Sequence, residues 1–357
     1  MEEMNQEGDA TQIEESSERR MSRFAFGIVL IIVVACIWVG ASEWIQWIFG
    51  DLDFQKPYFM TFFNTTGFCF YNLGFVLKSW RRIPWKHDAE SARLANAPLL
   101  YSISELWRCA LMFCPLWFAA NSLFNFSLAM TSVASNTILS STSSIWTLVM
   151  SRVILGQPIT IAKVVAVALV IGGSCLVATT DDGSASHSIA GDMVALLSAF
   201  FYGAYTTILK WCLPDEKKYN MGMVFGFVGV ANLLLMWPGI IALDLLKVEQ
   251  FEFPPLGVLG ALSLNALIGT NLSDVLWAKS VILTSPLVAT LGLSLTTPLA
   301  MIADFSIHGD RFSPAYVVGA ALVVVGFTAS SIPWDQIAVP WRDTRSTEEV
   351  HDSDGIS

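Results

Sequence analysis

The feature that most constrains this chain is a series of ten apolar stretches, each close to the length of a membrane-spanning helix. Crossing a hydrocarbon core of about 30 Å takes roughly 20 helical residues. The stretches occupy residues 24–48, 57–77, 106–129, 131–151, 160–179, 190–210, 221–245, 255–278, 281–304 and 314–332. Charged residues make up only 14% of the chain, compared with about 25% in soluble domains. The sequence therefore predicts an all-α polytopic membrane protein with ten transmembrane helices.

Both ends of the chain are acidic and polar. Seven of the 30 acidic residues lie within residues 1–20, and six follow Pro333. Segments of low hydrophobicity and high charge cannot bury enough apolar surface to fold alone. We therefore expect disordered acidic tails at residues 1–23 and 333–357, on either side of the membrane domain.

Lys and Arg are distributed unevenly between the two sets of loops. With the N-terminus in the cytoplasm, 17 of the 20 basic residues fall on the cytoplasmic side, and only Lys56, Lys247 and Arg311 fall on the other. Cytoplasmic loops of membrane proteins have such an excess of positive charge. The distribution predicts that both termini are cytoplasmic, since ten crossings return the chain to its starting side.

An internal repeat relates two parts of the chain. Residues 131–177 align without a gap to residues 284–330, with 13 identities in 47 positions. Five membrane crossings separate the fourth stretch from the ninth, an odd number, so the two copies have opposite orientations. The sequence thus predicts two inverted five-helix repeats, at residues 24–179 and 190–332. Such repeats are typical of secondary transporters that work by alternating access.

Polar residues in the fourth stretch recur at spacings that place them along one face of a helix. They are Asn136, Ser140, Ser143, Thr147 and Ser151. The equivalent ninth stretch presents Ser294, Thr297 and Asp304 on one face. Two interpretations remain open: both faces line a central polar cavity, or the hydroxyl groups bond their own helix backbone in a packed interface.

Two charged residues near the ends of stretches are further candidates. Glu43, in the outer half of the first stretch, would contact substrate or transfer a coupling proton, or would be an interfacial carboxylate. Lys210, at the end of the sixth stretch, would bind an anionic substrate, or would extend its ammonium group to the inner interface.

Pairs of polar side chains within two other stretches complete the set of candidates. Asn271 and Asp274 share a face and would bind a cation or a proton, while Asn121 and Asn125 are one turn apart and would face a cavity. Polar groups inside a membrane are costly and often functional. Structural hydrogen bonds are the alternative for both pairs.

Catalytic and energy-coupling motifs are absent from the sequence. There is no phosphate-binding GxxxxGK[ST] loop, no HExxH motif and no nucleophile elbow, and all four histidines fall outside the stretches. We therefore expect neither an enzyme nor an ATP-driven pump, with no catalytic residues, cofactor, metal site or nucleic-acid partner.

Several segments together resemble a known group of carriers. They are Trp38–Glu43, Asn136–Ser143, Phe225–Gly229, Asn232–Gly239, Phe251–Pro254, Leu283–Leu287 and Leu293–Leu299. In these segments the chain resembles the drug/metabolite transporter superfamily (EamA-like), and specifically the F branch of solute carrier family 35. The resemblance covers the chain from the first stretch to the tenth. It implies a ten-helix carrier in an endomembrane, vacuolar or Golgi, with both termini cytoplasmic.

The expected function is secondary active transport of a small polar metabolite by alternating access, with a proton or a counter-substrate as the coupled species, as in an antiporter. The lipid bilayer is the other expected partner, and the oligomeric state stays open. The alternative is a membrane scaffold or cargo receptor that does not transport and binds cytosolic partners through its acidic tails.

Overall fold

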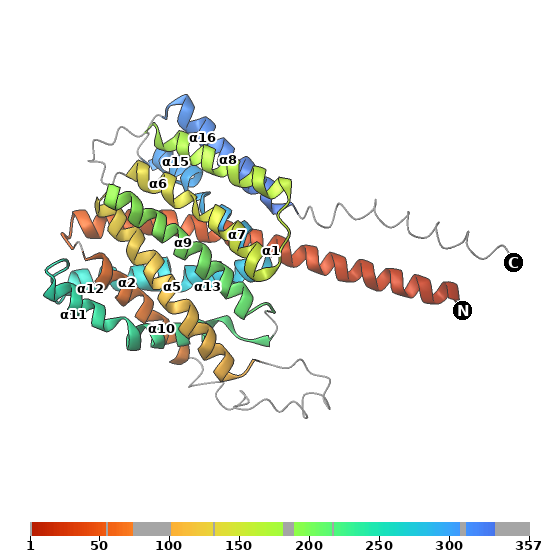
Figure 1. Cartoon of the computed structure of the whole chain (residues 1–357), viewed down its shortest axis with the longest axis horizontal. Helices are drawn as coiled ribbons and strands as arrows, with labels where there is room; N and C mark the ends of the chain where they lie inside the picture. The colour runs from red at the N-terminus through yellow and green to blue at the C-terminus, as the bar shows by residue number, and fades with distance from the viewer. Residues whose placement is uncertain are drawn as a thin grey trace.

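The computed structural model describes residues 2–54, 56–73, 101–130, 133–180, 189–215, 218–307 and 312–332. Within these ranges all regular secondary structure is helical (Figure 1). The elements are α1 (Glu2–Gly50), α2 (Pro57–Thr66), η1 (Gly67–Cys69), α5 (Ile103–Met130), α6 (Val133–Ser141), α7 (Ser143–Leu155), α8 (Ile161–Ala178), α9 (Ile189–Cys212), α10 (Met221–Leu235), α11 (Trp237–Leu245), α12 (Leu256–Leu264), η3 (Asn265–Leu272), α13 (Ser273–Leu283), α14 (Pro286–Leu293), α15 (Thr296–Ile307) and α16 (Pro314–Ser331).

Nine segments of the described chain are long and apolar enough to cross a membrane. The all-helical membrane fold is therefore confirmed. The remaining expected crossing, at residues 57–77, begins as α2, passes through the short 3₁₀ helix η1 and stays helical to Leu73. Its last four residues lie outside the described part of the chain.

The first helix is longer than the sequence predicts. α1 begins at Glu2 and so includes the acidic segment 2–23 that was expected to be disordered; in Figure 1 this part extends away from the bundle. Its Glu, Gln, Met and Arg residues are good helix formers, and an existing helix extends without a new nucleation step. The expected C-terminal tail, residues 333–357, lies outside the described residues.

Two crossings are interrupted by a turn near their middle. The first turn, at Thr142, separates α6 from α7, and the second, at Ser294 and Leu295, separates α14 from α15. Hydroxyl groups at both turns donate to carbonyl oxygens three residues earlier, as in Ser141 to Ile138 (2.7 Å) and Thr296 to Leu293 (2.8 Å). These bonds compete with the backbone ladder of the helix.

Helices from distant parts of the chain pack side by side in the bundle. α5 lies along α9, α1 along α13, and α8 along α16, the last pair forming one edge of the bundle (Figure 1). Buried side chains from these helices form one main apolar core. Each pair joins the N-terminal part of the chain to the C-terminal part, so neither half forms a separate bundle.

Candidate functional site

A cavity of about 470 Å³ lies between helices from both halves of the chain. Its walls come from α1, α2, α5, α6, α7 and α8 in the first half of the chain, and from α9, η3, α13, α14 and α15 in the second half. A volume of this size is typical of sites for small molecules.

Hydroxyl groups form the wall at the two interrupted crossings. The cavity is lined there by Thr137, Ser140, Ser141, Ser143, Thr290, Ser294, Thr296 and Thr297. Ser140 donates to Oδ1 of Asn136 (2.8 Å), and Thr290 donates to the Pro286 carbonyl (2.9 Å). Of the stripe in the fourth stretch, Ser140 and Ser143 line the cavity, whereas Asn136, Thr147 and Ser151 do not.

Four asparagines contribute amide groups to the cavity. Nδ2 of Asn121 donates to the Trp117 carbonyl (2.8 Å), and Nδ2 of Asn125 donates to Oγ1 of Thr61 (3.3 Å). Asn64 and Asn265 also line the cavity, and the buried Oδ1 atom of each has no hydrogen-bond partner among the described residues. Unpartnered buried carbonyl oxygens are costly, and such groups are uncommon in folded proteins.

Among the described residues that line the cavity, Asp274 is the single carboxylic acid, and none is a lysine, arginine or histidine. Its side chain is buried, with 6% of its surface exposed. The aromatic rings of Trp38, Trp117, Tyr202 and Tyr205 line the same space. The cavity thus combines one carboxylate with aromatic rings and neutral polar groups.

A π-helical segment places Asp274 and Asn265 on the same wall. In a regular α-helix, nine residues at about 100° each would place these two residues on opposite faces. The segment η3, from Asn265 to Leu272, is instead a π-helix, which has more residues per turn. The smaller rotation over η3 brings Asn265, Thr270 and Asp274 to the cavity together.

Seven of the residues proposed from sequence line this cavity. They are Asn121, Asn125, Ser140, Ser143, Asp274, Ser294 and Thr297. Two others lie elsewhere: Glu43 is exposed on α1, and Asn136 is buried against α5, where its Nδ2 donates to Oγ of Ser127 (2.8 Å). Asp304 belongs to α15, and its side chain is outside what the structure describes.

Asn271 and Lys210 also lie away from the cavity. Asn271 does not share the site of Asp274. The backbone carbonyl oxygen of Asn271 accepts from the Tyr71 hydroxyl (2.8 Å), and its side-chain amide packs against Gly67. Lys210 donates to the carbonyl of Ile282, which joins α9 to the end of α13. The Asn271 contacts therefore join the two halves of the chain, whereas the Lys210 contact lies within the second half.

Sequence reasoning did not identify Asn64, Asn265 or the aromatic part of the wall. The two asparagines had a usable signal, since each is an amide within an apolar stretch. The aromatic residues had none, because tryptophan and tyrosine are also common in packed helix interfaces and at the membrane surface.

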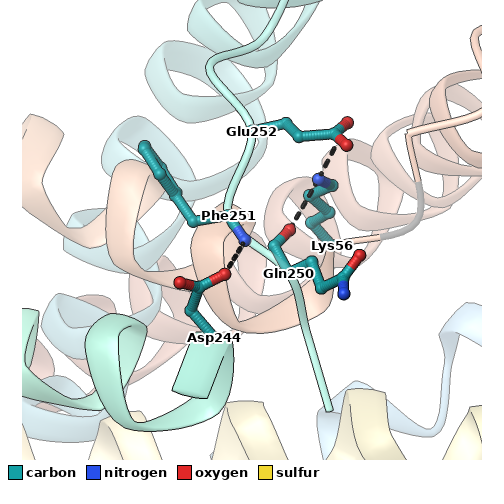
Figure 2. A network of polar contacts seen from close by, with 5 residues as sticks. All are labelled: Lys56, Asp244, Gln250, Phe251 and Glu252. Atoms are coloured by element: carbon teal, nitrogen blue, oxygen red, sulfur yellow. Dashed lines mark hydrogen bonds and ion pairs between the residues drawn. The ribbon is translucent and has the colours of Figure 1, made fainter. Parts of the chain in front are cut away.

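A polar network joins the residue before α2 to the segment between α11 and α12 (Figure 2). Nζ of Lys56 donates to the Gln250 carbonyl (2.7 Å) and pairs with Glu252 (3.3 Å), while Asp244 accepts from the Phe251 amide (2.9 Å). The network connects the start of α2 to the segment between α11 and α12.

Glu249, in the same segment, caps the start of α2. Its two carboxylate oxygens accept from the backbone amides of Tyr58 (2.9 Å) and Phe59 (2.8 Å). Burial raises the pKa of the Glu249 carboxyl above its ordinary value, although the two amide bonds and Lys56 act in the opposite direction. A carboxylate at this position complements the positive end of the helix dipole.

A contact between the two halves lies beside the cavity. Oγ1 of Thr147 on α7 lies 3.2 Å from Oγ1 of Thr290 on α14, and Thr290 lines the cavity. The bond from Lys210 to Ile282 joins α9 to α13 within the second half.

Comparisons with known proteins are consistent across family, relatives and fold. The model of the Triose-phosphate Transporter family matches residues 81–326. An uncharacterized vacuolar membrane protein of Saccharomyces cerevisiae is 34% identical over 352 residues, which cover 85% of this chain and 89% of that protein. Solute carrier family 35 member F5 of Mus musculus is 31% identical over 424 residues, covering 90% of this chain and 80% of that protein.

A solved crystal structure has the same fold, with a TM-score of 0.63 at 13% identity, and covers 89% of this chain and 99% of its own. That similarity concerns the fold alone. The family match and the two relatives confirm the resemblance to the F branch of solute carrier family 35, and the chain belongs to the triose-phosphate transporter family of multi-pass membrane transporters.

Proposed function

We propose that this protein is a secondary active transporter that moves a small polar metabolite across an endomembrane by alternating access. The observation that supports this most directly is the cavity between the two halves, whose walls use equivalent positions of the internal repeat. Thr137 and Thr290, 153 residues apart, both line it, as do Ser141 and Ser294 at the same spacing.

The helix boundaries support two inverted five-helix repeats. α6 and α14 begin 153 residues apart, α7 and α15 do so as well, and α8 and α16 match at both ends. The N-caps also correspond: Thr160 accepts from the Lys163 amide, and Ser313 accepts from the Tyr316 amide. In this scheme α2, η1 and the helical residues that follow form the second crossing of the chain, which brings the total to ten.

Contacts between the halves support the same symmetry. α8 and α16 approach closely where Gly173 meets Gly319, and again where Gly326 meets Ala166. The repeat relates Gly173 to Gly326 and Ala166 to Gly319, so each contact is the symmetry equivalent of the other. Likewise, the pair α5 and α9 corresponds to the pair α13 and α1.

An inverted repeat makes alternating access possible, because each half can adopt the conformation of the other and thereby exchange the open face. With the termini in the cytoplasm, the contact between Thr147 and Thr290 closes the cytoplasmic side of the cavity. The opposite conformation would break this contact and close the side that contains Lys56 and Glu252.

The vacuolar location in the name of the yeast relative supports an endomembrane. The excess of basic residues in one set of loops supports cytoplasmic termini. The coupled species, a proton or a counter-substrate, would bind in the same cavity or exchange through it.

The test is uptake of a metabolite library by the purified protein in liposomes under proton and cation gradients. A tryptophan at Ser294, which lines the cavity, is expected to abolish saturable uptake because its side chain fills much of the space. The matched control is Ser306→Trp on the exposed face of the same crossing, which should retain uptake. Absence of saturable uptake under every gradient, or equal activity of the two variants, contradicts the proposal.

A further inference from the structure

The substrate cavity is acidic and has no compensating base. Asp274 lines it, and none of the described residues around it is a lysine, arginine or histidine. Asp274 also makes no ion pair within the described part of the chain. A buried carboxylate without a positive partner is unfavourable, and a bound cation removes that cost.

Several hydroxyl groups of the wall use their donor inside the protein and keep acceptor capacity toward the cavity. The hydroxyl groups of Thr61, Ser141 and Thr290 each donate to a carbonyl of their own helix (2.8, 2.7 and 2.9 Å). Each hydroxyl has a single donor, so its oxygen keeps only acceptor capacity. One N–H of Asn121 and one of Asn125 are likewise used within the protein.

Aromatic rings lie close to the carboxylate. Tyr202 and Tyr205 line the cavity and pack edge-on against Trp277, with ring centroids 6.3 and 5.5 Å away. Trp277 follows Asp274 by one turn of α13. Aromatic faces attract organic cations, most strongly where water is excluded.

We infer that the transported substrate is an organic cation, planar and with N–H donors, for which Asp274 provides the counter-charge. This inference rests on the proposed function, since it assigns the cavity as the transport site. A phosphorylated or carboxylated solute would need cationic donors, which the described wall does not provide.

The experiment compares three small pyridines of nearly equal size and different charge: the 1-methylnicotinamide cation, neutral nicotinamide and the nicotinate anion. Binding to the purified full-length protein in nanodiscs is measured by calorimetry. We expect the cation to bind most tightly. Weaker binding of the cation than of nicotinamide or nicotinate, or no binding of the cation, overturns the inference without use of any variant.

Variants of Asp274 then test whether its carboxylate provides the counter-charge. Asp274→Asn should weaken cation binding on the order of 10- to 100-fold and leave nicotinamide binding unchanged, whereas Asp274→Glu should retain the preference for the cation. Glu43→Gln is the matched control, because Glu43 is an acid of the membrane region that lies outside the cavity. An equal loss for the cation and nicotinamide in Asp274→Asn would assign Asp274 a structural role.

Uptake of the same compounds into liposomes separates this inference from the proposed function. Charge-selective binding without flux of any compound would contradict transport and leave the cation site standing. Saturable uptake of nicotinate in preference to the cation would support transport and refute the cation site.

Discussion

The close contact between α8 and α16 allows a sharp prediction for Gly173→Ala. A methyl group at Gly173 would lie 2.6 Å from the Gly319 carbonyl oxygen and 3.0 Å from the backbone nitrogen of Val323. Both atoms belong to the backbone of α16, so no side chain can rotate away and the two helices must separate.

The magnitude follows from two opposing effects. Overpacking of a well-packed interface costs about 1–3 kcal/mol, while replacing glycine by alanine within a helix contributes about 1 kcal/mol in the stabilising direction. We expect Gly173→Ala to lower the free energy of unfolding by about 0–2 kcal/mol, the overpacking cost less the gain in helix propensity. Gly319→Ala should have a similar effect, since its methyl group would lie 2.7 Å from the Gly173 carbonyl oxygen.

Gly172→Ala is the matched control, because a methyl group there would meet nothing within 4 Å. Gly172→Ala has the same gain in helix propensity as Gly173→Ala but no clash. The difference in unfolding free energy between the two variants therefore isolates the packing cost. The assay is denaturant and thermal unfolding of the purified protein in one detergent, followed by tryptophan fluorescence. Equal stability of the two alanine variants would refute the close approach of the helices.

The double variant Gly173→Ala with Gly319→Ala adds a second criterion. A single separation of the helices relieves both clashes. The loss of unfolding free energy in the double variant should therefore be smaller than the sum of the losses in the two single variants. Strict additivity would mean that the two glycines do not share one contact.

Two further predictions concern Glu249 and Thr147. Between the ordinary pKa of a glutamic acid and the raised pKa of Glu249, the folded protein binds more protons than the unfolded chain, so stability from this group falls as pH rises through that window. Glu249→Gln should remove this pH dependence in unfolding midpoints measured across the acid range, and an unchanged profile would contradict it. In the proposed scheme the contact between Thr147 and Thr290 closes the cytoplasmic side of the cavity. Thr147→Val removes this hydroxyl contact and should increase thiol labelling, from the cytoplasmic side, of a cysteine placed at Ser294 in the cavity wall. Labelling equal to that of the parent with Thr147 intact would show that the contact does not hold this end closed.

Some properties of the protein follow from sequence because they depend only on local composition and order. Ten stretches of apolar residues require helices in a membrane, since the bilayer core offers no water to satisfy a peptide group. The alignment of residues 131–177 with 284–330 located the two interrupted crossings that contribute Ser140, Ser294 and Thr297 to the cavity.

The tertiary structure decided which polar groups face the cavity. Asn271 and Asp274 share a face in a regular helix, but the π-segment η3 and the packing against Gly67 and Tyr71 separate them. Asn265, on the opposite face by sequence, joins Asp274 instead. Helix rotation and local winding are set by contacts between the halves, so helical periodicity alone could not assign these residues.

The charge of the cavity was decided in the same way. Glu43, Lys210 and Asp274 are all ionisable residues at apolar stretches, and composition treats them alike. Packing leaves Glu43 exposed, directs Lys210 to the Ile282 carbonyl and buries Asp274 in the cavity wall. The sequence by itself determined a helical membrane protein with an internal repeat, because those properties depend on hydrophobicity, length and residue order. The choice of one carboxylate as the charged group of the site required the contacts between two halves that are distant in the chain.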